Sequence, residues 1–409
     1  MVNNRRILIS IFLIAFVLRL AAAIVYLNFD PHALTMHRPF LPFSKDSNDI
    51  WKALGDRDRY NAVAKNIITY GKIGYTHGRP PLYPIFLVIG YSIFGYNVFG
   101  FFISQILLAS ISSILIFFLA QRMFNDRVAI MASLFYALNP HFILFSIQLY
   151  AETLYFFLIL SVFLLCQKLL IKPTIGNAIT TGIFLALATL CRTVFLVFIP
   201  FVFIWLMAAF YYGRRKMLIL FVAIFMSFSL VYGTWVARDY KAILSQFILS
   251  ISKASWEAKD MHGLNKVFRH YEKEEYRKEI ITFINWIRED PIKIFNRCAQ
   301  QFKIFLFKPC AEGVSLRHKV VSSFIFFTIF PLGYLGLGLA MKERKKIAFL
   351  AFLFIVSMII FHSCHFLTIL DGELRYRLPV ELFITIFAAY GLNAILDLFS
   401  FKKYSLLQN

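Results

Sequence analysis

Two aspartates close to the start of the chain have the setting of candidate catalytic groups. Asp56 and Asp58 lie early in residues 55–66, where Tyr60 and later apolar side chains share one face of a predicted amphipathic helix. A carboxylate that such a helix holds at a membrane surface can act as a general base towards an attacking hydroxyl. The alternative is structural: Asp56 caps the helix and Asp58 favours its positive end.

Three arginines are candidates for binding a phosphate group. Arg79 opens the stretch 79–84, whose prolines stiffen the chain around it. Arg238 follows the end of one apolar run, and Arg375 precedes the last one. A guanidinium can bind phosphate through two parallel hydrogen bonds, so each of the three suits a phosphate headgroup. The alternative for each is an arginine that anchors its segment at the membrane interface.

Other ionisable side chains interrupt apolar runs. Glu152 lies at the end of one run, where a carboxylate is costly unless it faces a polar cavity or a partner, so a functional role is favoured. Arg19 and Arg192 can be functional or can snorkel to the headgroups. His362 and His365 approach the spacing of metal ligands, but two histidines without a third ligand indicate packing rather than a metal site.

The composition requires a membrane around these groups. Of 409 residues, 59% are hydrophobic and only 16% are charged, and several windows of about 20 residues carry almost no charge. They show no period-two alternation, so the predicted fold is an all-α integral membrane bundle. The net charge is +21, and the basic residues lie between the apolar runs, where signals for membrane orientation are found. This distribution argues against a nucleic-acid partner. The five cysteines show neither a CxxC pair nor zinc-ligand spacing, and no nucleotide-binding fingerprint is present.

The apolar pattern predicts one polytopic domain, 1–409, with about ten crossings. The predicted spans are 7–26, 97–120, 128–145, 153–170, 178–190, 194–210, 217–236, 321–341, 347–367 and 379–399. The run 82–94 is too short to cross and is assigned to a re-entrant or interfacial helix.

Positive charge sets the expected orientation. With the N-terminus in the cytoplasm, every short basic connection falls on the cytoplasmic side, namely 5–6, 122–127, 172, 214–216, 342–346 and 402–403. Two long segments, 27–95 and 237–320, then face outward together with the candidate chemistry. We therefore expect both termini in the cytoplasm, the bacterial inner or plasma membrane as location, and a site on the other side.

Taken in order, these motifs resemble a known superfamily along nearly the whole chain. It is the GT-C glycosyltransferase type that includes protein O-mannosyltransferases and aminoarabinose transferases, glycosyltransferase family 39 in kind. The matching elements are Arg19, Asp56-x-x-x-Tyr60-x-x-x-Ala64, 79–84, 119–124, 137–140, Glu152, Arg192, 235–238 and 375–379. Two departures are Asp239, where asparagine is common, and Glu381, where a second proline often occurs.

The resemblance implies a reaction. The donor would be a sugar on a polyprenyl phosphate, and the acceptor a hydroxyl of a lipid, glycan or protein, attacked with inversion outside the cytoplasm. Asp56, or failing that Asp58, would be the base, while Arg79, Arg238 and Arg375 would neutralise the phosphate. Glu152 would position the acceptor or help to hold a divalent cation, since metal dependence varies within the superfamily. The alternative function is a transporter or flippase of a lipid-linked sugar.

Overall fold

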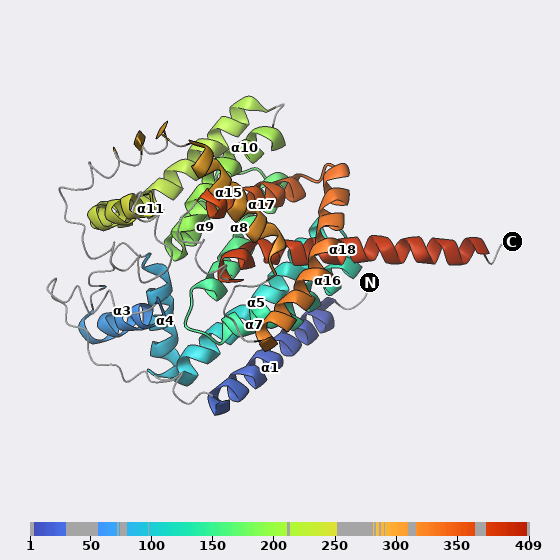
Figure 1. Cartoon of the computed structure of the whole chain (residues 1–409), viewed down its shortest axis with the longest axis horizontal. Helices are drawn as coiled ribbons and strands as arrows, with labels where there is room; N and C mark the ends of the chain where they lie inside the picture. The colour runs from blue at the N-terminus through green and yellow to red at the C-terminus, as the bar shows by residue number, and fades with distance from the viewer. Residues whose placement is uncertain are drawn as a thin grey trace.

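The chain folds into helices. The computed structural model describes residues 4–29, 56–71, 73, 80–96, 98–210, 213–251, 281, 284–285, 288–289, 291–309, 316–364 and 374–406. Every regular element bounded within this part is a helix (Figure 1). They are α1 (Asn4–Phe29), α3 (Asp56–Tyr70), α4 (Leu82–Phe94), α5 (Val98–Met123), α6 (Asp126–Leu138), α7 (Pro140–Ser146), α8 (Glu152–Ile171), α9 (Ile175–Cys191), η3 (Thr193–Phe198), α10 (Ile199–Ala209), α11 (Arg214–Ile251), α15 (Pro291–Phe307), α16 (Leu316–Lys342), α17 (Lys346–Cys364) and α18 (Leu374–Leu406).

The helices confirm the predicted all-α membrane fold. Among the described residues, 7 helices are long and apolar enough to cross a bilayer, and the bent pair α6–α7 makes up to 8. The two other predicted crossings coincide with shorter apolar helices, α9 and the continuous η3–α10 segment. Helix α4 has 13 residues, about 20 Å of helix against a hydrocarbon core of about 30 Å. Its length agrees with the prediction that it does not cross.

The predicted span 128–145 is bent by 57° between α6 and α7. Pro140 is the cause, because it has no N–H to continue the hydrogen bonds of α6. Asn139 starts the next helix: its side chain accepts a hydrogen bond of 2.8 Å from the backbone N–H of His141. The break thus places a short polar stretch inside an apolar bundle.

Arg19 donates hydrogen bonds to backbone carbonyl groups that the break leaves at the end of α6. Its guanidinium donates to the carbonyl oxygens of Ala137 at 3.3 Å and Tyr136 at 3.4 Å, at the end of α6. It also bonds to the carbonyl of Ala15 in its own helix. Its side chain is fully buried, so of the two alternatives for Arg19 the snorkelling one is wrong. Buried polar side chains re-satisfy a broken backbone where water is absent.

Helices α16 and α18 run side by side in the same direction. Gly333 faces Ile384, and Gly336 faces Phe387, so residue numbers rise together along both helices. A Cβ on either glycine would lie under 3.0 Å from the backbone of α18, which means that the two backbones nearly touch there. Helix α17, which connects them, must therefore run in the opposite direction, as the predicted alternation requires.

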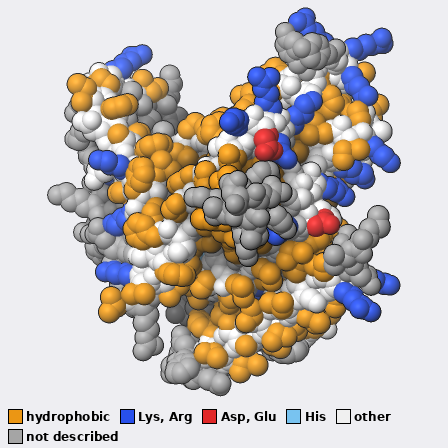
Figure 2. All heavy atoms as spheres, turned by 90° about the vertical axis from the view of Figure 1, so that its right-hand side faces the viewer, with side chains coloured by type: hydrophobic (Ala, Val, Ile, Leu, Met, Phe, Trp, Pro, Cys, Tyr) orange, Lys and Arg blue, Asp and Glu red, His pale blue; other side chains and the backbone are white. Residues whose placement is uncertain are grey.

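Two lysines of the basic connection 342–346 tie several helix ends together. Lys345 Nζ donates to the carbonyl of Met123 at the end of α5, and Lys346 Nζ donates to the carbonyl of Ala209 at the end of α10, each at 2.8 Å. Ammonium groups suit these positions because the last carbonyls of a helix are partly negative. The C-terminal part of α18 projects from this end (Figure 1). Lys and Arg side chains are spread over the face seen from there (Figure 2).

Replacing Arg344 by glycine is expected to stabilise this connection. Arg344 has φ of 54°, a left-handed conformation that costs a non-glycine residue about 1 kcal/mol. Thermal unfolding in detergent should show a higher midpoint for Arg344→Gly. Arg344→Ala is the control, since it removes the same charge but keeps a Cβ. An equal gain in both variants would mean that charge repulsion, not backbone strain, was relieved.

Candidate functional site

A buried ion pair lies at the end of the bundle opposite these lysines. Glu152 begins α8, and Arg192 lies between α9 and η3; their side chains meet at 2.6 Å and are 3% and 17% exposed. The two residues are 40 positions apart, so only the fold brings them together. The snorkelling alternative for Arg192 therefore gives way to an ion pair with a residue that was predicted to be functional.

A second arginine joins this pair across an aromatic ring. The guanidinium carbons of Arg192 and Arg375 lie 5.9 and 4.9 Å from the ring centre of Tyr376. Arg375 also donates a hydrogen bond of 2.9 Å to the Tyr376 hydroxyl and lies over the ring of Tyr150. Arg192 is paired with Glu152, and Arg375 lies beside the same Tyr376 ring. We call Glu152, Arg192, Arg375 and Tyr376 the arginine cluster; its formal charge is positive, which suits an anion.

Aromatic side chains surround the arginine cluster. Arg192 also lies over the ring of Tyr155, at 5.7 Å. His362, at the end of α17, stacks on Phe305 of α15 and lies 5.3 Å from the ring of Tyr376. This is the packing role expected for His362, whereas His365 lies outside the described residues. No group of three or more His, Cys, Asp or Glu side chains gathers in the part of the chain that the structure describes.

Tyrosines join the two helices described within the segment 27–95, α3 and α4. Tyr60 of α3 meets Tyr83 of α4 edge to face, with ring centres 4.9 Å apart. The hydroxyl of Tyr91 donates to Asn61 Oδ1 at 3.0 Å and holds the same two helices together. Tyr60 and Tyr83 belong to the two motifs that were read as functional. Their contact shows that these motifs pack against each other.

Gln105 continues the connection towards Glu152. Tyr83 donates to Gln105 Oε1 at 3.3 Å, and Gln105 Nε2 donates to the carbonyl of Gln148 at 2.7 Å. Gln148 lies four residues before Glu152. Gln105 is fully buried. It was not predicted from the sequence, although an amide side chain within the apolar run 97–120 was an available signal.

The structure describes only some of the remaining predicted site residues. Asp56 and Asp58 lie in the first turn of α3, a helical turn or less before Tyr60, but their side chains lie outside the described part. Arg79 also lies outside it. Arg238 is at a kink of α11, 42% exposed, with Nε 4.0 Å from Asp239 Oδ2. The structure thus gathers Glu152 and Arg375 in the arginine cluster and places Arg238 at a more open position.

Comparison with known proteins gives a family match and a fold. Residues 78–237 match the family model described as dolichyl-phosphate-mannose-protein mannosyltransferase. No curated protein matches the chain in sequence.

Solved structures resemble the whole chain at low identity. The oligosaccharyltransferase AglB from Archaeoglobus fulgidus, in complex with an inhibitory peptide and a dolichol-phosphate, is 13% identical with a TM-score of 0.55 over 100% of this chain and 52% of its own. ArnT from Cupriavidus metallidurans, bound to undecaprenyl phosphate, is 15% identical with a TM-score of 0.52 over 92% of this chain and 60% of its own. The present chain therefore spans little more than half the length of these proteins. At such identity the likeness concerns the fold alone. The fold and the family match over residues 78–237 agree with the resemblance of the motifs to the GT-C superfamily.

Proposed function

We propose that the chain is an inverting glycosyltransferase that moves a sugar from a polyprenyl phosphate to a hydroxyl of a lipid, glycan or protein. The observation that carries this proposal is the arginine cluster, where Arg192 and Arg375 approach the ring of Tyr376 and Arg192 is paired with Glu152. Two guanidinium groups close together at one end of the bundle, with one carboxylate among the four side chains of the cluster, favour an anionic ligand. The lipid phosphates bound to the AglB and ArnT structures support the choice of anion.

The leaving group explains why arginines are needed. In the donor, the phosphate is a diester with one negative charge. When the bond between the anomeric carbon and the phosphate oxygen breaks, that oxygen keeps the electron pair and the phosphate gains a second charge. Arg192 and Arg375 would stabilise this developing charge, which lowers the barrier more than it stabilises the bound donor.

The acceptor requires a base on the opposite side of the sugar. Asp56, or failing that Asp58, would take the proton of the acceptor hydroxyl as its oxygen bonds to the anomeric carbon, so that the configuration inverts. The packing of Tyr60 against Tyr83 supports a place for the start of α3 near the connection that leads to Glu152.

The role proposed for Glu152 is to orient Arg192. Its carboxylate is engaged by that guanidinium at 2.6 Å, so a positive charge already occupies the position where a metal ion would bind it. The residues described around it do not complete a metal site. This role differs from the two expected from the resemblance, which were to position the acceptor and to help hold a divalent cation.

The location of the arginine cluster supports a non-cytoplasmic site. Lys345 and Lys346 lie near the start of α17, whereas His362, which contacts Tyr376 of the cluster, lies near its end. Lysine-rich connections face the cytoplasm as a rule. The cluster at the other end of the same helix would then face outward.

Arg375→Ala is expected to weaken binding of undecaprenyl phosphate about 10- to 100-fold, since a hydrogen bond to a charged group contributes about 1.5–3 kcal/mol. Binding can be titrated with purified protein in detergent. Arg127→Ala is the matched control, because Arg127 is an exposed arginine paired with Asp397 away from the cluster. Equal binding by wild type and Arg375→Ala would remove Arg375 from the phosphate site.

A transporter and a transferase differ in what happens to the donor. Proteoliposomes that contain the protein, a polyprenyl-phosphate sugar and a cell-envelope extract as acceptor should release polyprenyl phosphate if the proposal is right. A transporter would move the donor between leaflets and leave its sugar–phosphate bond intact. Extract without protein is the control for spontaneous hydrolysis.

A further inference from the structure

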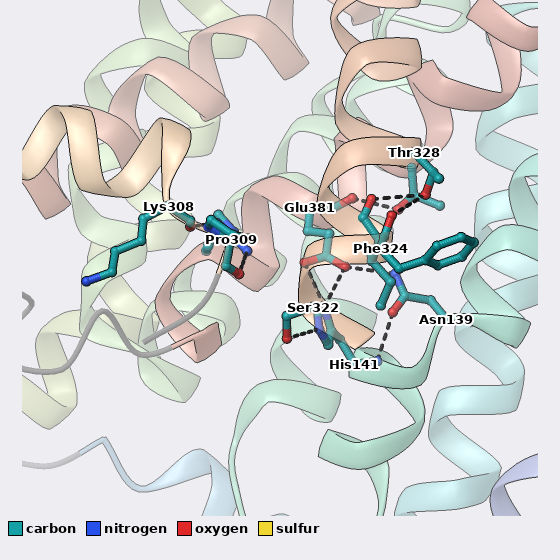
Figure 3. Close-up of polar contacts among 11 residues, drawn as sticks. Asn139, His141, Lys308, Pro309, Ser322, Phe324, Thr328 and Glu381 are labelled. Atoms are coloured by element: carbon teal, nitrogen blue, oxygen red, sulfur yellow. Dashed lines mark hydrogen bonds and ion pairs between the residues drawn. The ribbon is translucent and has the colours of Figure 1, made fainter. Parts of the chain in front are cut away.

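A buried polar cluster, made of residues that were not predicted as site residues, joins three helices (Figure 3). Glu381 of α18 accepts from Asn139 Nδ2 at 2.8 Å, and its two carboxylate oxygens lie 3.0 and 3.2 Å from His141 Nδ1. The other ring nitrogen of His141 lies 3.0 Å from the hydroxyl of Ser322 in α16. Glu381 and Ser322 are fully buried, and His141 is 2% exposed. Figure 3 shows their side chains converging from α7, α16 and α18.

Such a cluster is costly within a membrane bundle. A buried carboxylate is stable only when polar or charged groups compensate its charge and satisfy its hydrogen-bond acceptors. Here Asn139 and His141 provide these contacts. Both partners sit at the break between α6 and α7. The cluster therefore fixes α18 against the one point in that segment where the backbone changes direction.

Arg377 holds the same face of α18 one turn earlier. Its guanidinium donates to the carbonyls of Lys308 at 2.5 Å and Pro309 at 2.7 Å, just after the end of α15. It also lies over the rings of Phe326 and Phe330 of α16, at 5.1 Å from each. Arg377 is 6% exposed, so this contact is an internal clamp.

The clamp and the arginine cluster lie on opposite faces of one helix. Successive residues of an α-helix turn by about 100°, so Arg377 projects about 200° from Arg375, and Glu381 lies within about 40° of Arg377. Arg375 and Tyr376 face Tyr150 and Arg192, whereas Arg377 and Glu381 face the interior contacts described above. The contacts of Arg377 and Glu381 fix the rotation of α18 about its axis. That rotation determines the direction in which Arg375 and Tyr376 point.

The first turn of α18 depends on these contacts because of Pro379. This proline lies inside the helix, and without an N–H it cannot bond to the carbonyl of Arg375. The turn that carries Arg375 is thus joined to the rest of α18 by a weakened backbone. Side chains before and after the proline, Arg377 and Glu381, are anchored to other helices instead.

We propose that Glu381, with His141 as its partner, and Arg377 are positioning residues for the phosphate of the lipid donor. They set the rotation of the first turn of α18 and so hold Arg375 and Tyr376 beside Arg192. This inference rests on the proposed function of the arginine cluster. Glu381 stands where the resemblance leads one to expect a second proline, and its hydrogen-bond contacts with Asn139 and His141 anchor the turn.

The test measures undecaprenyl phosphate binding to the full-length protein in detergent, for wild type, Glu381→Gln and Arg377→Lys. Glutamine at position 381 removes the negative charge that lies beside His141 and Asn139. Lysine at position 377 keeps the positive charge but loses the simultaneous hydrogen bonds of arginine to the carbonyls of residues 308 and 309. Each is expected to weaken binding about 5- to 20-fold, as loss of a charge-assisted contact would, at a temperature where near-ultraviolet circular dichroism shows native packing.

Trp205→Phe controls for general destabilisation. It removes the hydrogen bond from Trp205 Nε1 to the carbonyl of Lys346 at the other end of the bundle, so it should lower the melting temperature and leave binding unchanged. Equal weakening by Trp205→Phe would overturn the inference, because loss of stability alone would then weaken binding. If Glu381→Gln fails to fold, Arg377→Lys carries the test.

The comparison with Arg375→Ala separates the two proposals. If Arg375→Ala binds weakly while folded Glu381→Gln and Arg377→Lys bind like wild type, the positioning inference is wrong and the proposed function stands. If wild type and Arg375→Ala bind undecaprenyl phosphate equally, both proposals fail. Weak binding by all three variants with normal binding by Trp205→Phe is the expected result.

Discussion

Asp56→Asn is expected to lower the rate of sugar transfer by about 10²- to 10⁴-fold, the usual contribution of a general base. The amide cannot accept a proton from the acceptor hydroxyl, but it keeps nearly the same size at the first residue of α3. Binding of undecaprenyl phosphate should stay near the wild-type value, because the phosphate is assigned to Arg192 and Arg375. Initial rates in proteoliposomes and binding titrations measure the two quantities separately.

Asp58→Asn is the matched control, two residues further along the same helix. It makes the identical chemical change and should retain most of the activity. Full activity in Asp56→Asn with loss in Asp58→Asn would move the base to Asp58. Full activity in both variants would remove the start of α3 from the reaction and leave only its structural role.

Gly336→Ala is expected to separate α16 from α18 and to destabilise the protein by several kcal/mol. A Cβ at this position would lie 1.9 Å from the carbonyl oxygen of Phe387 and 2.8 Å from the backbone nitrogen of Gly391. Neither is a side chain that can rotate away, so the helix backbones must move apart. The shift would also disturb the first turn of α18 and hence lipid-phosphate binding.

Gly338→Ala is the matched control in the same helix. A Cβ there meets nothing within 4 Å, and alanine is the better helix former by about 1 kcal/mol. Thermal unfolding in detergent should therefore show a large loss for Gly336→Ala and none for Gly338→Ala. Equal melting temperatures for the two variants would contradict the close approach of α16 and α18.

The sequence predicted those features that are local. The apolar runs gave the helical bundle, and the length of 82–94 gave the short helix α4. Glu152 stood out because an intramembrane carboxylate needs a partner. The identity of that partner could not be read, because no pattern along the chain links residues 152 and 192.

Long-range contacts explain the other differences. The role of Arg19 stayed open between function and snorkelling because its position in the first span says nothing of the carbonyls that α6 presents to it. His141 and Glu381 are 240 residues apart, so their pairing depends on the packing of α7 against α18. Pro379 was expected to start a helix, but α18 begins five residues earlier and contains it. Tertiary contacts of Arg377 and Glu381 on both sides of the proline explain why the helix continues through it.

The most direct test of the account compares a lipid phosphate with the matching uncharged lipid. Undecaprenyl phosphate and undecaprenol have the same hydrocarbon chain and differ only at the headgroup that the arginine cluster is proposed to bind. Titration of purified wild-type protein should show binding of the phosphate that is at least about 10-fold tighter, since two guanidinium groups interact with its charge. Equal affinity for the two lipids would contradict the assignment of Arg192 and Arg375 to a lipid phosphate.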